Sequence, residues 1–248
     1  MSDALILGGT GWLSGRVARR LLDDGVSVTC MGRGSRPAPE GAELVTADRD
    51  DPDAYVAVAA RPWDRVVDVS SRADHVAAAV AALGDATAHW TYVSSVSVYS
   101  DDVTVGADES APRHRQAQPG DDDDYGAQKA AAEDAVGTLD GRALIVRPGL
   151  IVGQGDPSDR FGYWAAAFAR TADRPVLTPD ARERSCQVID VDDLAGYIAT
   201  TTATGAVNAV GDRHPLGDVF AVIRAAAGHT GEVLIAADDW LEARGVAF

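Results

Sequence analysis

The stretch ALILGGTGWLSGRVARRLLDDGVSVTCM, residues 4–31, decides the fold. Apolar runs at 4–7 and 26–31 indicate two short strands, and between them Leu13, Val17 and Leu21 recur at the spacing of one helix face. A strand, a helix and a second strand in this order predict parallel pairing with a right-handed crossover. The stretch therefore predicts the first unit of an α/β sheet.

The same alternation of apolar runs and helical patterns continues to about residue 148. It predicts a Rossmann-type doubly wound parallel sheet with helices on both faces, built from residues 1–157 and continued by about 186–212. We expect residues 158–185 and 213–248, where the alternation weakens, to form a small C-terminal substrate lobe. Residues 101–124 are polar and contain two prolines, which predicts a long surface loop.

The composition limits the range of partners. A formal net charge of −16 argues against binding to nucleic acid or to anionic membranes, because these partners are negative too. Cys30 and Cys186 lie far apart without a C-x-x-C motif, so we expect neither a metal site nor a disulfide framework. The first residues show no basic leader and no long apolar run. We expect a cytoplasmic protein with a small-molecule substrate, and a homodimer remains an open alternative.

The turn GGTGWLSG, residues 8–15, follows the first predicted strand and opens the helix. Gly8 and Gly11 permit a tight turn and close approach of a pyrophosphate to the backbone, and the helix N-terminus favours its negative charge. The pattern predicts a dinucleotide site, although glycines in a turn can be purely conformational. Ser14 stands where a third glycine is usual, which questions close helix packing there. The residues expected to complete the contact surface are Thr10, Trp12 and Leu13.

The end of the second predicted strand, VTCMGRGSRP at residues 28–37, bears on the choice of cofactor. An acidic residue at this point holds a free 2'-hydroxyl, whereas an arginine accommodates a 2'-phosphate. This segment has no carboxylate; Gly32 leaves room, and Arg33 and Arg36 can pair with a phosphate. The sequence predicts NADP, with NAD as the alternative. The alternative for the arginines is a solvated loop.

Lys129 is the only lysine of the chain, whereas arginine occurs 21 times. Arginine can replace lysine wherever only a solvated charge is needed, so the one retained ammonium indicates chemistry. Tyr125 lies four residues earlier in a segment with a helical pattern, which places both side chains on one helix face. A phenol ordinarily titrates at about 10, and a nearby ammonium favours proton exchange closer to neutral pH. The pair is therefore a candidate functional site; the alternative is an incidental surface lysine.

Serines gather in TYVSSVSVYS, residues 91–100, at the end of a further predicted strand. The carboxyl ends of parallel strands form the ligand crevice of an open sheet. Taken alone, serines at a strand end are most often turn formers. Ser95 lies four residues before Tyr99, and Ser94 and Ser97 are the competing candidates for a catalytic hydroxyl.

Four motifs in order carry a resemblance to a known family. They are the glycine turn, Ser95 before a Val-Tyr end, Tyr125-x-x-x-Lys129, and Arg147-Pro148 after the next predicted strand. With them the chain resembles the extended (atypical) short-chain dehydrogenase/reductase family, which includes NAD(P)-dependent epimerases and dehydratases. The register of that family prefers Ser95 over its neighbours.

The resemblance implies hydride transfer between a nicotinamide cofactor and a carbon that bears oxygen, coupled to proton transfer at that oxygen. It makes Tyr125 the general acid/base and lets Lys129 also hydrogen-bond the nicotinamide ribose. Ser95 would orient the substrate oxygen. Asp48 resembles the adenine contact of the family, and Pro148 is a further expected cofactor contact.

The reaction type is narrowed by the residues after Ser95. Dehydratases of the family carry an Asp-Glu pair there, where this chain has Val96 and Ser97. Dehydration is therefore disfavoured. We expect an NADP-dependent oxidoreductase that acts on a carbonyl or hydroxyl carbon of a sugar-like or secondary-metabolite substrate. The alternative is a nucleotide-sugar epimerase with tightly bound cofactor, and a less favoured one is a non-catalytic NADP sensor or an RNA-binding relative.

Substrate contacts are expected mainly from the second lobe. Arginines and aromatic residues there could grip a diphosphate and a base, or could form ion pairs and core. In VIDVDDL, residues 188–194, Asp190 replaces a histidine of the family motif, which argues against a standard nucleotide-sugar site. The chain is short for the family, so we expect a reduced lobe. The candidate substrate residues are Ser97, Arg160, Phe161, Tyr163, Trp164 and Arg184.

Overall fold

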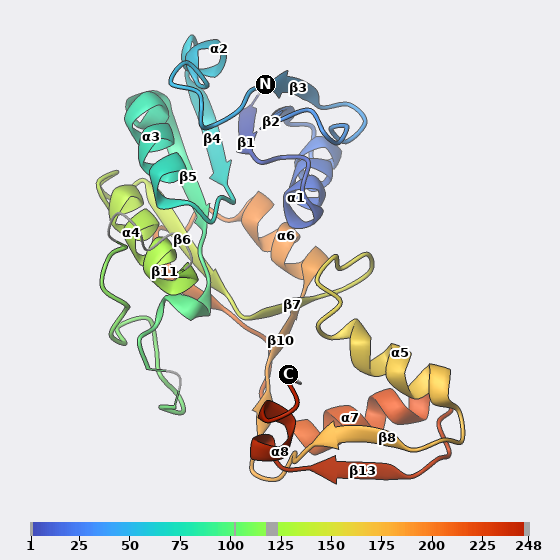
Figure 1. Cartoon of the computed structure of the whole chain (residues 1–248). Helices are drawn as coiled ribbons and strands as arrows, with labels where there is room; N and C mark the ends of the chain where they lie inside the picture. Colours follow the sequence, from blue (N-terminus) through green and yellow to red (C-terminus); the bar gives the residue numbers. More distant parts are fainter. Residues whose placement is uncertain (1, 102, 118–123, 246–248) are drawn as a thin grey trace. The chain divides into compact units, whose positions relative to one another are not determined.

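Figure 1 shows the computed structural model of the chain, with its helices and strands labelled. The residues that the structure describes are 2–101, 103–117 and 124–245. The chain divides into two compact units, which are residues 1–151 with 189–210, and residues 152–188 with 211–248. Part of the long loop expected at 101–124, including the aspartates at 121–123, lies outside the described residues.

The first unit is built on a seven-stranded sheet in which all neighbouring strands are parallel. In spatial order the strands are β11 (Gly205–Ala209), β6 (Ala143–Pro148), β5 (Thr87–Val93), β4 (Trp63–Asp68), β1 (Asp3–Leu7), β2 (Ser27–Gly32) and β3 (Glu43–Thr46). The chain order reverses between β1 and β4, and sheets of this kind bind ligands outside the carboxyl ends of the strands at that point. The predicted Rossmann-type doubly wound sheet is confirmed.

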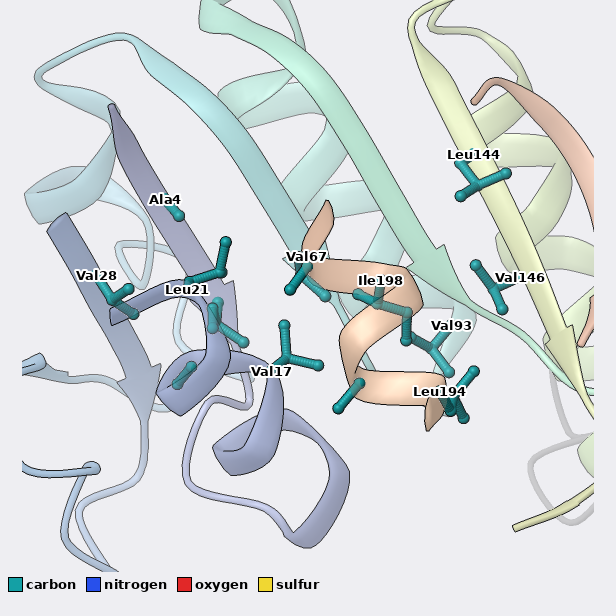
Figure 2. Close-up of a cluster of buried hydrophobic side chains, with 14 of the residues drawn as sticks. Ala4, Val17, Leu21, Val28, Val67, Val93, Leu144, Val146, Leu194 and Ile198 are labelled. Atoms are coloured by element: carbon teal, nitrogen blue, oxygen red, sulfur yellow. The ribbon is translucent and has the colours of Figure 1, made fainter. Parts of the chain in front are cut away.

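Helices cover both faces of this sheet. They are α1 (Trp12–Asp23) and α6 (Val191–Thr200) on one face, and α3 (Ala73–Leu83), α4 (Tyr125–Gly137) and the short α2 (Val56–Ala59) on the other. Figure 2 shows Val17 and Leu21 of α1 and Leu194 and Ile198 of α6 gathered against the strands, among them Val67 of β4. The spacing of four residues in each helix aligns these side chains on one face. Burial of each large aliphatic side chain contributes about 1.5–3 kcal/mol.

The composition of α4 lets it lie close to the sheet. Ala127, Ala130 and Ala132 are all buried, and small side chains allow the helix axis to approach the strands. On the face of the sheet that α4 covers, Trp90 and Tyr92 of β5 belong to a second cluster of buried hydrophobic side chains. The close approach of α4 brings its first turns, which carry the candidate acid/base pair, to the carboxyl ends of the strands.

The second unit contains three helices and two small sheets among the residues that the structure describes. The helices are α5 (Gly162–Thr171), α7 (Leu216–Ala226) and α8 (Asp238–Glu242). The sheets are the parallel pair β8 (Val176–Pro179) and β13 (Val233–Ala236), and the antiparallel pair β9 (Ser185–Cys186) and β12 (His214–Pro215). Phe168, Val176 and Ile223 form the centre of its small core.

Four short elements remain in the described ranges. They are η1 (Gly84–Ala86), η2 (Val96–Val98), β7 (Leu150–Val152) and β10 (Val188–Asp190). β7 and β10 contain two of the three points at which the chain passes from one unit to the other, and the third follows β11 at residues 210–211. None of the helices in the described residues is long and apolar enough to cross a membrane.

Candidate active site

The glycine turn passes from β1 into α1 in a conformation that depends on glycine. Gly8 has a φ of 81°, and its N–H donates to the Met31 carbonyl in β2 at 2.8 Å. The Ser14 hydroxyl donates to the Gly8 carbonyl at 2.6 Å and accepts the Gly11 N–H at 3.1 Å. Ser14 is only 1% exposed. The serine in place of a third glycine therefore packs closely and ties the turn to the start of α1.

Gly9, which the sequence analysis did not single out, packs against β2. A Cβ at this position would lie 2.6 Å from Cys30 Sγ and 3.0 Å from the Ile6 carbonyl. Burial raises the pKa of the Cys30 thiol to about 11, so this side chain is an uncharged packing group. In the sequence, the Gly8-Gly9 dipeptide is the feature that could have identified this position. The turn thus presents backbone without side chains, which fits the close approach that a cofactor pyrophosphate needs.

Gly9→Ala is expected to destabilise the protein by about 1–3 kcal/mol, because the added methyl group overlaps side-chain and backbone atoms of two strands. The matched control is Gly15→Ala, where the nearest atom to the new Cβ lies at 3.9 Å in the same segment. The control should be neutral, or more stable by up to about 1 kcal/mol from helix propensity. Urea unfolding of both variants measures the difference. Equal stabilities would show that Gly9 is not held against β2.

The end of β2 lies beside the glycine turn. A Cβ on Gly32 would meet Thr10 Oγ1 at 3.4 Å. Arg33 and Arg36 follow, both exposed, and neither has a hydrogen-bond or ion-pair partner among the described residues. Asp48 lies exposed in the turn after β3, where its Oδ1 accepts the N–H of Asp50 at 3.2 Å. Two guanidinium groups without partners among the described residues therefore follow β2.

Trp12 and Leu13 begin α1 with different surroundings. The Arg16 guanidinium lies 6.0 Å from the centroid of the Trp12 ring, and Arg16 also pairs with Asp192 of α6 at 2.8 Å. Leu13 packs against the apolar cluster between α1, α6 and the sheet. The Leu13 side chain is therefore part of the core, which leaves its backbone for contact with a ligand.

Three serines follow β5 in distinct environments. Ser94 is 3% exposed and its Oγ has no hydrogen-bond partner among the described residues. Ser95 is the N-cap of η2: its Oγ accepts the Ser97 N–H at 3.1 Å and lies 3.1 Å from Ser97 Oγ. Ser95 is half-buried, whereas Ser97 is exposed. Of the two partly accessible hydroxyls, that of Ser95 lies nearer to the strand end.

Lys129 is 2% exposed and reaches across the ends of two strands. Its Nζ donates to the Ser70 carbonyl just beyond β4 at 2.9 Å, and to the Val93 carbonyl at the end of β5 at 2.8 Å. The ring centroids of Tyr92 and Tyr125 lie 4.8 and 5.7 Å from Nζ. Burial lowers the pKa of Lys129 to about 8, and the negative charges of Asp68 and Glu133 oppose this shift. The incidental surface lysine is therefore excluded.

Tyr125 is the first residue of α4 and is 46% exposed. Asp124 caps the helix by accepting the Ala127 N–H at 2.9 Å. A Cβ on Gly126 would lie 2.6 Å from the Ser97 carbonyl, so the first turn of α4 lies against η2. The structure thus brings the Ser95–Ser97 segment, Tyr125 and Lys129 together beside the ends of β4 and β5. Gly126, which permits the approach, was not recognised from the sequence.

Asp68 and Arg49 form a buried ion pair that the sequence analysis also missed. Arg49 Nη1 and Nη2 each donate to one carboxylate oxygen of Asp68 at 2.8 Å. The Asp68 side chain is 0% exposed and that of Arg49 is 11% exposed. Arg49 Nε donates to Tyr55 Oη at 2.8 Å, and Nη2 also donates to the His75 carbonyl at 2.7 Å. Asp68 is the last residue of β4, and it lies two residues before Ser70, whose carbonyl accepts a hydrogen bond from Lys129.

Glu133 connects α4 to β6. Its Oε1 accepts Arg147 Nε at 2.9 Å, and its Oε2 accepts Arg147 Nη2 at 2.7 Å and Arg113 Nη1 at 3.0 Å. Arg147 Nη1 also donates to Tyr99 Oη at 2.8 Å. Arg147 therefore holds the helix of the acid/base pair against the sheet. Pro148, an expected cofactor contact, is the last residue of β6.

Arg160 and Arg184, the arginines proposed for substrate contact in the second unit, and the nearby Arg182 all make local contacts. Arg184 is paired with Asp238, and Arg182 with Asp180 at 2.5 Å. Arg160 Nε lies 3.3 Å from Ser158 Oγ. These contacts agree with the structural interpretation of the arginines more closely than with a diphosphate site.

The aromatic candidates of the second unit have mixed surroundings. Trp164 packs on Phe220, with ring centroids 4.8 Å apart, and Tyr163 contacts Trp164 edge-on while remaining 48% exposed. A cavity of about 260 Å³ lies in this unit, with mostly apolar walls. The residues that line it are Phe161, Cys186, Val188, His214, Asp218, Val219, Val222 and Ile223.

Asp190 has a structural role at the start of α6. Asp190, at the place of the family histidine, is the N-cap of α6 and accepts the Asp192 N–H at 2.7 Å.

Asp50, Asp74 and His75 form the one cluster of metal-ligand type within the described part of the chain. Arg72 pairs with Asp50 at 3.0 Å and with Asp74 at 2.5 Å, so a side-chain cation already occupies this cluster.

Comparison with known proteins places this geometry in a family. The family model described as NAD dependent epimerase/dehydratase matches residues 4–211. The 2'-dehydrokanamycin reductase of Streptomyces kanamyceticus is 32% identical over 227 residues. The aligned part is 86% of this chain and spans only 62% of the length of that curated relative.

Solved structures share the fold at low sequence identity. UDP-N-acetylglucosamine 4-epimerase from Bacillus cereus superposes with a TM-score of 0.75 at 16% identity, over 96% of this chain and 86% of that one. The enzyme WbmG of Bordetella bronchiseptica in complex with NAD has a TM-score of 0.76 at 16% identity, over 94% of this chain and 81% of that one. These likenesses support the fold, and the family match covers the segments that carry the glycine turn, Ser95, Tyr125 and Lys129. The resemblance inferred from the motifs is confirmed: the chain belongs to the NAD-dependent epimerase/dehydratase family.

Proposed function

We propose that the chain is an NADP-dependent reductase of a sugar-like or secondary-metabolite ketone that carries no diphosphate. The observation that carries the proposal is the placement of Lys129. Its ammonium is buried at the ends of β4 and β5, with the Tyr125 ring centroid 5.7 Å away. Burial of a cation is unfavourable, and strongly perturbed groups of this kind concentrate at functional sites.

The residues present fit a nicotinamide dinucleotide. Backbone of Gly8, Gly9 and Gly11 would hold the pyrophosphate, and Lys129 would hydrogen-bond the nicotinamide ribose. When bound, NADPH supplies the hydride that the substrate carbonyl carbon accepts. Tyr125 donates its phenolic proton to the carbonyl oxygen, and Ser95 donates a hydrogen bond to the same oxygen. The tyrosine then regains a proton from solvent.

Lys129 stabilises the charge that develops on Tyr125 during proton transfer. The Tyr125 ring centroid lies 5.7 Å from Lys129 Nζ, and for two unit charges about 6 Å apart at an effective dielectric constant of about 20 Coulomb's law gives about 3 kcal/mol. That is about a hundredfold in rate, within the range of general acid–base catalysis. Because Tyr125 and Lys129 lie four residues apart on α4, they share one face of the helix, with the ammonium buried and the phenol exposed.

Arg33 and Arg36 support the choice of NADP over NAD. Both guanidinium groups are exposed just beyond β2 and lack partners among the described residues. No carboxylate competes for the position at the strand end. A guanidinium can bind a 2'-phosphate through two parallel hydrogen bonds.

NADPH is therefore expected to bind at least about tenfold more tightly than NADH, or about 1.4 kcal/mol. Arg33→Ala should remove most of that difference. Arg19→Ala, an exposed arginine of α1 without a partner in the described part of the chain, is the control with the same change of charge. Fluorescence titration of both cofactors measures the ratio. Equal affinities in the wild type would contradict the proposal.

The substrate class is supported by the second unit. Of its two candidate arginines, Arg184 is paired with Asp238 and Arg160 contacts Ser158, and the walls of its cavity are mostly apolar. Neither feature suits a nucleoside diphosphate. The net charge of −16 favours encounter with a cationic molecule, and the relative of 32% identity is named 2'-dehydrokanamycin reductase.

The test compares three ketones under NADPH: 2'-dehydrokanamycin, a neutral keto sugar, and a UDP-linked 4-keto sugar. We expect net NADPH oxidation with one of the first two and none with the UDP-linked compound. The rival activity is epimerisation, in which the cofactor stays bound. Protein that is purified with tightly retained cofactor, and that interconverts UDP-sugars without net NADPH consumption, would overturn the proposal.

A further inference from the structure

The clamp of Arg49 on Asp68 is connected to the catalytic lysine through one residue. Asp68 Oδ1 accepts the Ser70 N–H at 2.9 Å. The Ser70 carbonyl in turn accepts Lys129 Nζ at 2.9 Å and Tyr92 Oη at 3.1 Å. The same short segment is therefore fixed by the carboxylate on its amide side and holds the ammonium on its carbonyl side.

Arg49 leaves Asp68 little freedom. Two parallel hydrogen bonds of 2.8 Å set the plane of the carboxylate, and the other contacts of the guanidinium are to Tyr55 and the His75 carbonyl. Bidentate pairs of this kind combine strength with directional precision. A fully buried carboxylate is retained only where such partners compensate for its desolvation.

The charged and titratable groups that face Lys129 come from three elements. They are Asp68 at the end of β4, Tyr92 of β5, and Tyr125 and Glu133 of α4. Burial raises the pKa of Tyr92, so this ring remains a neutral phenol. Glu133 is already paired with two cations, Arg147 and Arg113. Asp68 is thus the anion on the strand side of the lysine.

We propose that Asp68 is the positioning residue of Lys129: held by Arg49, it fixes the Ser70 carbonyl that binds the ammonium and supplies the negative charge that keeps the ammonium protonated. The inference rests on the proposed role of Lys129 in catalysis. Asp68 acts on the reaction through the lysine and not by contact with the reacting atoms.

The test uses the fact that Lys129 is the only lysine. Incorporation of isotope-labelled lysine gives one side-chain NMR signal, and its pH titration reports the protonation of Lys129 directly, without cofactor or substrate. Asp68→Asn keeps the size of the side chain and removes its charge. Asp64→Asn, the same change at an exposed position of the same strand, is the matched control.

In Asp68→Asn we expect the pKa of Lys129 to fall by about one unit or more below its wild-type value, and the lysine-dependent limb of the pH–rate profile to move with it. Asp64→Asn should leave the titration unchanged. The sign of the shift separates the proposal from a merely structural role. A loosened site would let water reach the ammonium, and its pKa would rise toward that of an ordinary lysine.

An unchanged or raised lysine pKa in folded Asp68→Asn would overturn the proposal. If the uncompensated Arg49 prevents folding, the double variant Arg49→Met/Asp68→Asn removes cation and anion together, because a buried pair can be replaced jointly, and it should show a smaller fall of the lysine pKa in the same direction. An inactive wild type would contradict the proposed function alone, since the titration is read without turnover.

Discussion

Replacing Lys129 by arginine is expected to lower turnover at least about a hundredfold, or about 2.7 kcal/mol of transition-state stabilisation. The ammonium donates to two carbonyls at 2.8 and 2.9 Å from a site that is 2% exposed. A planar guanidinium is larger and cannot place donors on both carbonyls while its charge stays beside Tyr125. Overpacking of this site should also cost about 1–3 kcal/mol of stability.

Tyr125→Phe separates chemistry from stability. Because Tyr125 is 46% exposed, loss of its hydroxyl should change the free energy of unfolding by less than about 0.5 kcal/mol. Turnover should fall as far as in Lys129→Arg, and the double variant should be little worse than either single one, since the two residues act as a unit. NADPH oxidation with the accepted ketone, beside thermal unfolding, measures both effects. Wild-type turnover in well-folded Lys129→Arg would refute the proposed role of the lysine.

Glu133→Gln is expected to produce the largest loss of stability, about 3–5 kcal/mol. The carboxylate is 0% exposed and binds Arg147, whose side chain is 5% exposed, through two hydrogen bonds. The substituted amide would have no charge to offset that buried guanidinium, and its NH₂ group would be a donor facing other donors. The variant should therefore unfold at much lower urea concentration.

Asp134→Asn is the control for this change, one residue along the same helix. Asp134 pairs with Arg113 at 2.7 Å, but both side chains are 33% exposed, so solvent screens the interaction. We expect a loss below about 1 kcal/mol. Similar losses in the two variants would mean that the buried Arg147–Glu133 pair contributes no more than a partly exposed one.

The sequence predicts the parts of this site that depend on local pattern. A glycine turn between a strand and a helix, and a tyrosine four residues before a lysine, are visible because their spacing is short. The parallel order of the strands follows from the alternation of strands and helices. Gly9 and Gly126 went unrecognised because their importance comes from atoms of Cys30 and of Ser97, which are distant in sequence.

The buried ion pairs could not be predicted for the same physical reason. Arg49 and Asp68 are 19 residues apart, and Glu133 and Arg147 are 14 apart. Nothing in their neighbouring residues distinguishes them from the many solvated charges of this chain. Their partners are chosen by the stacking of α4 on the sheet and by the strand order, which are properties of the assembled fold. The burial of Lys129 is likewise visible only in three dimensions.

The discontinuity of the first unit has a consequence for how the protein is made. Helix α6 supplies Leu194 and Ile198 to the cluster that also holds Val17, Leu21 and Val67, yet it is translated only after residues 152–188 of the second unit. Until then one face of the nascent sheet is covered by α1 alone, and strand β6 lacks its neighbour β11. A growing chain with such a face is exposed to aggregation. The ribosome must therefore release a large part of the second unit before the first can close, so the two are made as nested rather than successive folding units.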